Sequence, residues 1–181
     1  MSERVYSTGL IPASPAELRG LAFDVEHWTR DAYAGDLEAR ICAALMSADG
    51  WDYQPEKPYQ PAVKEGRKIV RKAVYAVGPR IYRHWTTPGD GRSFYGSIGS
   101  EETRAPSLLT QMQMAWGLMD RGYVLIHLSD ISGNGLPAAH VGGGPEMRAE
   151  GKAFGAATTE ATLVAAILRC EAMAREIEAD A

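Results

Sequence analysis

The sequence predicts an α+β fold, in which helices pack on a small antiparallel sheet as a helix–sheet–helix sandwich with a long insertion. Three observations predict this class. Amphipathic helical patterns stand in the first, middle and last parts of the chain, a strand pair with a short turn lies in the second half, and residues 52–105 interrupt the regular pattern. The order of helix, helix, insertion, helix, hairpin and helix is typical of helices that cover an antiparallel sheet.

The composition is that of an ordinary globular protein. The chain has 181 residues, of which 45% are hydrophobic and 23% charged. We expect one domain over residues 1–181, with an N-terminal helical extension over 1–35 and an insertion over 52–105. The sequence contains no apolar run of about 18 residues, which predicts no membrane span. Two sparse cysteines and no leader pattern favour a cytoplasmic location.

Two helices are predicted before the insertion. Ser14 as N-cap, Pro15 in the first turn and Glu17 as capping-box partner predict the start of the first helix. Its apolar stripe is Leu18, Leu21, Val25 and Trp28. The second helix begins after Asp36 and ends at Gly50. Its stripe is Leu37, Ile41 and Leu45.

The insertion shows no single periodicity. Prolines and tyrosines make residues 52–62 an irregular, partly extended segment. The stretch "RKIVRKAVYAV", residues 67–77, fits neither the helical nor the strand period cleanly, so a strand and a short helix both remain open. The glycine-rich stretch over residues 86–100 predicts a loop with tight turns. A loop of that length inside a compact domain is functional, mobile or a misread element.

Regular structure returns at Pro106. A helix is predicted up to Gly122, with its apolar residues on one face: Leu108, Leu109, Met112, Trp116 and Met119. A hairpin follows, with strands over 123–131 and 136–141 around the turn "SGNG". Pro137 favours an edge position for the second strand, and residues 152–157 suggest another short strand. The last helix carries a buried stripe of Leu163, Ile167, Cys170, Ala174 and Ile177.

The closing stretch combines glycines with a threonine-rich helix start, as phosphate-binding loops do. However, Lys152 precedes Gly155, whereas a Walker loop needs its lysine after the glycine turn. A dinucleotide fingerprint also needs spaced glycines, and residues 142–144 are contiguous. We therefore interpret Thr158 or Thr159 as the N-cap of the last helix.

A basic and aromatic cluster in the insertion is the candidate ligand site. Residues 63–85 carry seven Lys or Arg and one Glu, a net charge of +6, although the whole chain is -4. The candidate ligand-binding residues are Arg80, Tyr82, Arg83, Trp85, Arg92, Phe94 and Tyr95. Arginines interleaved with aromatic rings suit pairing with phosphate and stacking on a base. The alternative is that the rings are buried and the arginines solvated.

Other chemistry finds little support in the sequence. His127 and His140 would be cross-strand neighbours in one hairpin register, but no Cys or Glu completes a ligand set, so we predict no metal site. The nucleophile motif G-x-S-x-G is absent, and Cys170 lies within a helical stripe where an inert thiol is expected. We predict no catalytic residue and no cofactor, and we interpret the protein as non-enzymatic.

Three stretches together resemble phage ABA sandwich domain proteins. They are "LEARICAALMSADGW", "APSLLTQMQMAWGLMDRGYVLIHL" and "GAATTEATLVAAILRCEAMA". The resemblance covers residues 36–51 and 105–175 in the family's order, whereas residues 1–35 have no counterpart and 52–104 exceed the usual connection. It implies a sandwich encoded by a phage or prophage, and hence a place in the host cytoplasm. Some small phage proteins of comparable architecture are oligomeric sponges for nucleotide immune signals.

Two functional hypotheses follow. The first is a phage accessory protein that binds a small anionic ligand through the cluster around Arg80, with a nucleotide immune signal as ligand and an anti-defence role. The second is a protein-interaction or virion-assembly module without a small-molecule ligand, for which a homo-oligomer is one form. A nucleic-acid partner for Lys64 to Arg83 is disfavoured by the charge of the whole chain.

Overall fold

The computed structural model describes residues 3–7, 12–88, 97–129 and 136–181. Its α-helices are α1 (Pro15–His27), α2 (Gly35–Leu45), α3 (Met112–Gly117) and α4 (Thr159–Ala179). Its strands are β1 (Val5–Tyr6), β2 (Asp52–Gln54), β3 (Val63–Glu65), β4 (Lys68–Arg71), β5 (Arg80–Thr86), β6 (Ile98–Arg104), β7 (Val124–Ser129), β8 (Ala138–Gly143) and β9 (Ala149–Phe154). Short 3-10 turns are η1 (Ser47–Asp49), η2 (Met119–Arg121) and η3 (Pro145–Met147).

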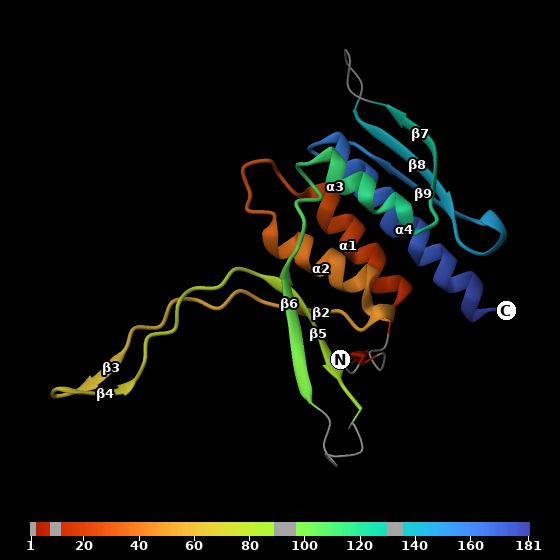
Figure 1. The fold of residues 1–181 in the computed structure, drawn as a ribbon. Helices are drawn as coiled ribbons and strands as arrows, with labels where there is room; N and C mark the ends of the chain where they lie inside the picture. The colour runs from red at the N-terminus through yellow and green to blue at the C-terminus, as the bar shows by residue number, and fades with distance from the viewer. Residues whose placement is uncertain (1–2, 8–11, 89–96, 130–135) are drawn as a thin grey trace.

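The α+β class is confirmed, and the helices form the middle layer. Helix α4 packs on β8 and β9 of a three-stranded antiparallel sheet, while α2 packs on β2 and β5 of a four-stranded one. Helix α1 lies between, in contact with both α4 and α2 (Figure 1). The layer order is therefore sheet, helices, sheet, and not the predicted helix–sheet–helix. In the described residues these two sheets are separate and each has helices on one face, while β3 and β4 form a third sheet of two strands.

Helix α4 supplies the centre of the core. Its residues from Ala161 to Leu168 are all buried, and Thr158 caps it by accepting a hydrogen bond from the backbone N–H of Ala161 at 2.9 Å. The helix lies close to β9. An added Cβ on Gly151 would lie 1.9 Å from the Ala166 carbonyl oxygen, so only glycine permits this approach. The predicted cap is confirmed for Thr158.

Helix α1 belongs to this core. The predicted capping box is present, with the Ser14 side chain bound to the Glu17 backbone and the Glu17 side chain bound to the Ser14 backbone. Leu18, Leu21 and Val25 are buried, as the stripe predicts. The segment that was expected to be an N-terminal extension is thus part of the core, because one face of α1 packs against α4.

The four-stranded sheet is built around β5. Strand β6 pairs with β5 over its full length, from Arg80 opposite Arg104 to Thr86 opposite Ile98. Strands β2 and β1 share the other edge of β5, with Tyr82 opposite Asp52 and Trp85 opposite Tyr6. The loop predicted over residues 86–100 therefore gives way to strand at both ends, while residues 89–96 lie outside the described part.

Residues 55–79 form a two-stranded antiparallel arm that projects from the body (Figure 1). Strands β3 and β4 pair near its tip, and isolated bridges join Gln60 to Val74 and Lys57 to Val77 closer to the body. We call this segment the arm. The open choice for residues 67–77 is thus settled as extended, and Gly66, at φ +60°, makes the turn at the tip.

The middle helix is shorter than predicted. Leu108 and Leu109 are buried but precede α3, which begins only at Met112. Bonds from elsewhere hold this segment outside the helix. The Leu109 N–H donates to Glu38 Oε1 at 3.0 Å, and the Leu109 carbonyl accepts from the Thr158 hydroxyl at 2.7 Å. Trp116, expected on the buried face, is 39% exposed.

The predicted hairpin of the second half is present, but its second strand is not at an edge of the sheet. Strand β8 is the central strand, between β7 and β9, although Pro137 suggested an edge. Pro137 stands just before the strand begins, so its missing N–H costs no ladder bond, and its carbonyl accepts from the Gly155 N–H at 2.8 Å. The predicted turn lies outside the described residues. No helix in the described ranges is long and apolar enough to cross a membrane.

Candidate functional site

The predicted ligand residues on β5 lie on two opposite faces of its sheet. Successive side chains of a strand point to opposite faces. Arg83 and Trp85 share the face of the buried Ile81, toward α2, whereas Arg80 and Tyr82 share the outer face. The remaining candidates Arg92, Phe94 and Tyr95 lie outside the described residues. The structure therefore does not gather the four described candidates into one pocket.

Arg83 is held inside the protein. Its guanidinium lies 3.6 Å from the ring centroid of Tyr6 and 4.5 Å from that of Trp51. It also pairs with Glu101, at 3.3 Å from Nη2 to Oε2, and its side chain is only 22% exposed. The two aromatic rings and the Glu101 carboxylate thus already contact the guanidinium group with which a phosphate would have to pair.

The other three described candidates also have partners within the chain. Arg80 pairs with Glu102 at 3.5 Å. The Tyr82 hydroxyl donates to Asp52 Oδ2 at 2.8 Å, and this hydrogen bond raises the pKa of Tyr82. The Trp85 ring lies against Gly99, where an added Cβ would stand 2.4 Å from it. All four described candidates therefore have partners within the chain, but Tyr82 and Trp85 are only half-buried and Arg83 is not solvated, unlike in the alternative.

The surface that sequence reasoning missed is the arm. Six large apolar side chains on it are at least 39% exposed: Tyr59, Val63, Ile69, Val70, Val74 and Tyr75. The arm also carries six basic and two acidic side chains, a net charge of +4, so the rest of the chain is -8. No ion pair in the described part of the chain involves an arm cation.

Apolar and basic side chains mix on both faces of the arm. In β4, Ile69 and Arg71 point to one face while Lys68 and Val70 point to the other. All four are exposed, so neither face packs against the body. The only sequence signal for this arrangement is the run of β-branched and basic residues without a clean period of two.

A groove of about 530 Å³ runs between α1, α2 and β2. Its floor is apolar, with Leu21, Ala43 and Trp51, and its rim carries Glu17, Asp24 and Asp52. Arg40 is the one cation among the lining residues that the structure describes, and it pairs with Asp24 at 3.1 Å. The backbone N–H and hydroxyl of Ser14 lower the pKa of Glu17, so this carboxylate stays charged. The groove is thus apolar with an acidic rim.

A second hollow, of about 420 Å³, lies at the root of the arm. Arg30, Arg104, Ser107 and Thr110 line it together with the buried Glu38. The Arg30 Nε donates to the Ala157 carbonyl at 2.9 Å. Burial raises the pKa of Glu38, against the opposing effect of backbone N–H donors from Leu109 and Leu108.

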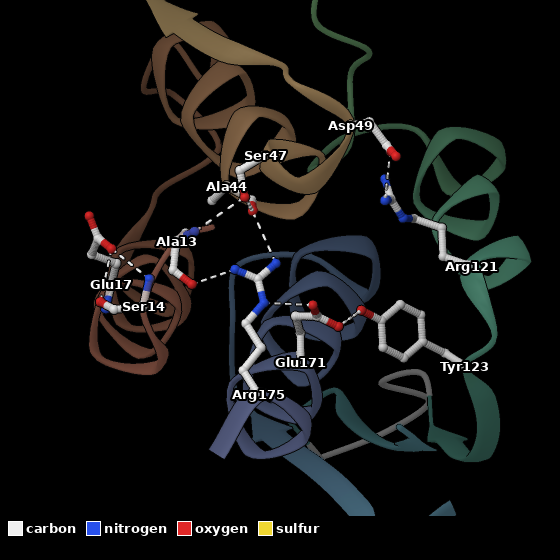
Figure 2. Close-up of polar contacts among 10 residues, drawn as sticks. All are labelled: Ala13, Ser14, Glu17, Ala44, Ser47, Asp49, Arg121, Tyr123, Glu171 and Arg175. Atoms are coloured by element: carbon white, nitrogen blue, oxygen red, sulfur yellow. Dashed lines mark hydrogen bonds and ion pairs between the residues drawn. The ribbon is translucent and has the colours of Figure 1, made fainter. Parts of the chain in front are cut away.

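A half-buried polar network joins four segments of the body (Figure 2). The Arg175 guanidinium donates to Glu171 Oε1 at 2.8 Å and to the carbonyls of Ala13 and Ala44. The Tyr123 hydroxyl donates to Glu171 Oε2 at 2.5 Å. Burial and this hydrogen bond raise the pKa of Tyr123. All these groups bond to one another or to backbone, so the network ties the N-terminal segment and α2 to α4.

The histidines and cysteines form no reactive cluster. His127 and His140 are cross-strand partners, and His140 Nε2 lies 3.2 Å from Glu150 Oε2. Within the described ranges, no group of three or more His, Cys, Asp or Glu is placed to hold a metal ion. Burial raises the pKa of the Cys42 thiol to about 12 and that of Cys170 to about 11, so both thiols stay protonated near neutral pH.

No family model, curated protein or solved structure matches the chain. The resemblance to phage ABA sandwich proteins therefore stays a prediction. Function must be inferred from the chain itself.

Proposed function

We propose that this protein is a non-enzymatic protein-interaction module that docks through its arm. This is the second of the two functions that the sequence suggested. The projecting arm is the observation that carries it, because its apolar side chains have nothing to pack on within the described body. From the resemblance alone, we also propose that a phage or prophage encodes the module.

Such an arm needs a partner that covers its apolar side chains. An isolated two-stranded hairpin is at best marginally stable in water, and contiguous exposed apolar surface marks interaction sites. The arm nevertheless extends over residues 55–79, with unpaired ladder groups along both edges. A protein partner can bury the apolar side chains and pair with the basic ones at the same time.

The ion pairs on β5 explain why the first hypothesis, an anionic ligand bound around Arg80, is less well supported. Arg80 and Arg83, which were to pair with phosphate, already have carboxylate partners in Glu102 and Glu101. Binding a phosphate there would require breaking these ion pairs, whereas the arm cations need no such change.

Capture with two matched baits tests the proposal. Ile69→Asp places a charge on the arm, and Ile98→Asp makes the same change on β6, where Ile98 is 82% exposed. Both baits are incubated with lysate of cells that encode the protein, beside the natural chain. We expect a protein that the natural chain and Ile98→Asp retain and that Ile69→Asp loses. Equal capture by all three baits, or capture of nothing, would refute docking through the arm.

A second candidate keeps the anionic-ligand hypothesis but moves it to the hollow at the root of the arm. Arg30 and Arg104 offer two guanidinium groups there, with hydroxyls from Ser107 and Thr110. A thermal-shift series with cyclic and linear nucleotides tests it, since a ligand that binds only the folded state raises Tm. Arg104→Ala should abolish the shift and Arg80→Ala should preserve it. A series without any shift eliminates this candidate.

A further inference from the structure

We propose that the partner of the arm is a second copy of this chain, and that the arm docks in its groove between α1, α2 and β2. The inference rests on the proposed function and deepens it. It follows from two surfaces of the same chain, the arm and the groove, which are complementary in charge and both partly apolar. Within one copy these two surfaces do not meet.

The first match is electrostatic. The arm has a net charge of +4 and the rest of the chain -8. The groove concentrates part of this negative charge, with three carboxylates on its lining against the guanidinium of Arg40. At the tip of the arm, by contrast, Arg67, Lys68 and Arg71 lie on or beside β4, and the one acidic residue there, Glu65, is opposite Lys68. Complementary charge of this kind steers association and fixes its register.

The second match is apolar. The groove floor is formed by Leu21, Ala43 and Trp51, which belong to the core and are 6–7% exposed, so it is apolar and shallow. Ile69 and Val70, both more than 40% exposed, lie on the same strand as Lys68 and Arg71. Because Ile69 and Val70 point to opposite faces, a strand laid in the groove can bury one of them on the floor while a cation of the strand reaches the acidic rim.

The geometry favours exchange between copies. The arm extends away from the body that carries the groove (Figure 1), so the groove within its reach belongs to a neighbour. Reciprocal docking gives a closed dimer, whereas docking in one direction gives a ring or a fibre. Either product is an assembly held together by arms.

Gly20 offers a sharp test, because it lines the groove and a Cβ added there meets nothing within 4 Å. Gly20→Lys and Gly20→Glu both replace glycine within α1 by a good helix former, so both should fold. They place opposite charges at one point of the rim. In sedimentation velocity we expect Gly20→Lys to weaken self-association by about tenfold or more and Gly20→Glu to preserve it.

A charge swap completes the experiment. Arg67→Glu with Arg71→Glu lowers the net charge of the arm from +4 to 0, and this double variant alone should associate weakly. Mixed with Gly20→Lys, it should associate more strongly than either variant does alone, since the carboxylates introduced at positions 67 and 71 can then pair with the ammonium group introduced at position 20. The dissociation constant of the natural chain should also rise with salt, because the Debye length falls from about 10 Å at 0.1 M to about 3 Å at 1 M.

The outcomes separate the inference from the proposed function. Equal association of the two Gly20 variants, or no recovery in the mixture, overturns docking in the groove. A natural chain that stays monomeric overturns the second copy as partner. The proposed function survives both results if the natural chain still captures a protein that Ile69→Asp loses, and that protein is then the partner.

Discussion

Lys57 and Val77 exchange both of their backbone hydrogen bonds, at 2.8 Å from the Lys57 nitrogen and 2.9 Å from the Val77 nitrogen. This pair closes the arm where it leaves the body. Beyond it, no large side chain of the arm is buried, so the arm and the core are physically separate parts of one chain.

Removing the arm should therefore leave the body folded. Replacing residues 58–76 by Asn-Gly turns the Lys57–Val77 pair into the end of a tight hairpin, for which this dipeptide is the favoured turn. We expect the Tm of the truncated chain to stay within a few degrees of the natural one, because no core contact is lost. Circular dichroism melting measures this. Loss of cooperative unfolding would mean that the arm is part of the core.

Arg83 should matter for stability more than Arg80. Arg83→Ala removes contacts with Tyr6, Trp51 and Glu101, and we expect it to lower the free energy of unfolding by about 1–3 kcal/mol. Arg80→Ala removes a half-exposed ion pair and should cost less than about 1 kcal/mol. Urea titration of both variants provides the comparison. Equal small effects would show that the ring contacts of Arg83 contribute nothing.

The stability should depend on pH through Glu38. Burial raises the pKa of this carboxyl from its ordinary value near 4.5. The folded state then binds the proton more tightly than the unfolded chain does. Its contribution to stability is therefore present at low pH and is lost as pH rises toward the folded pKa.

Glu38→Gln removes this titration. The Tm of the variant minus that of the natural chain should increase as pH rises above about 4.5. Differential scanning calorimetry at a series of pH values measures it. A difference that is independent of pH would show that the carboxyl titrates alike in the folded and unfolded states.

Both thiols should be inert in the native protein. Cys42 and Cys170 are buried, and burial raises the pKa of each. A thiol-specific chromogenic reagent at about pH 8 should label neither cysteine until denaturant is added, when both should react. Rapid labelling of one cysteine in the native chain would place it at the surface.

The sequence predicted the helices well where caps and apolar stripes coincide. Ser14 with Glu17 placed the start of α1, and the Thr158 cap placed the start of α4, because both signals are local. The prediction of α3 was wrong at its start. Long-range bonds from Glu38 and Thr158 hold Leu109 outside the helix, and no local pattern carries that information.

The sheets and the candidate site were harder to predict. Strand β6 contains Gly99, Ser100 and two glutamates, residues with low β-propensity, and it forms because β5 pairs with it along its whole length. The candidate ligand residues were chosen by their nearness in sequence, although alternation along β5 sends Arg80 and Arg83 to opposite faces. The arm could not be recognised because its apolar residues cover no core and thus follow no core periodicity.

Photo-crosslinking from the arm tests the central claim most directly. A photoreactive phenylalanine analogue replaces Tyr75, which is 79% exposed on the arm, or Phe154, which is 64% exposed on β9, as matched control. Irradiation in cells that encode the protein should give a discrete protein adduct from position 75 and none from position 154. The absence of a protein adduct at position 75, or the same adducts from both positions, would contradict docking through the arm.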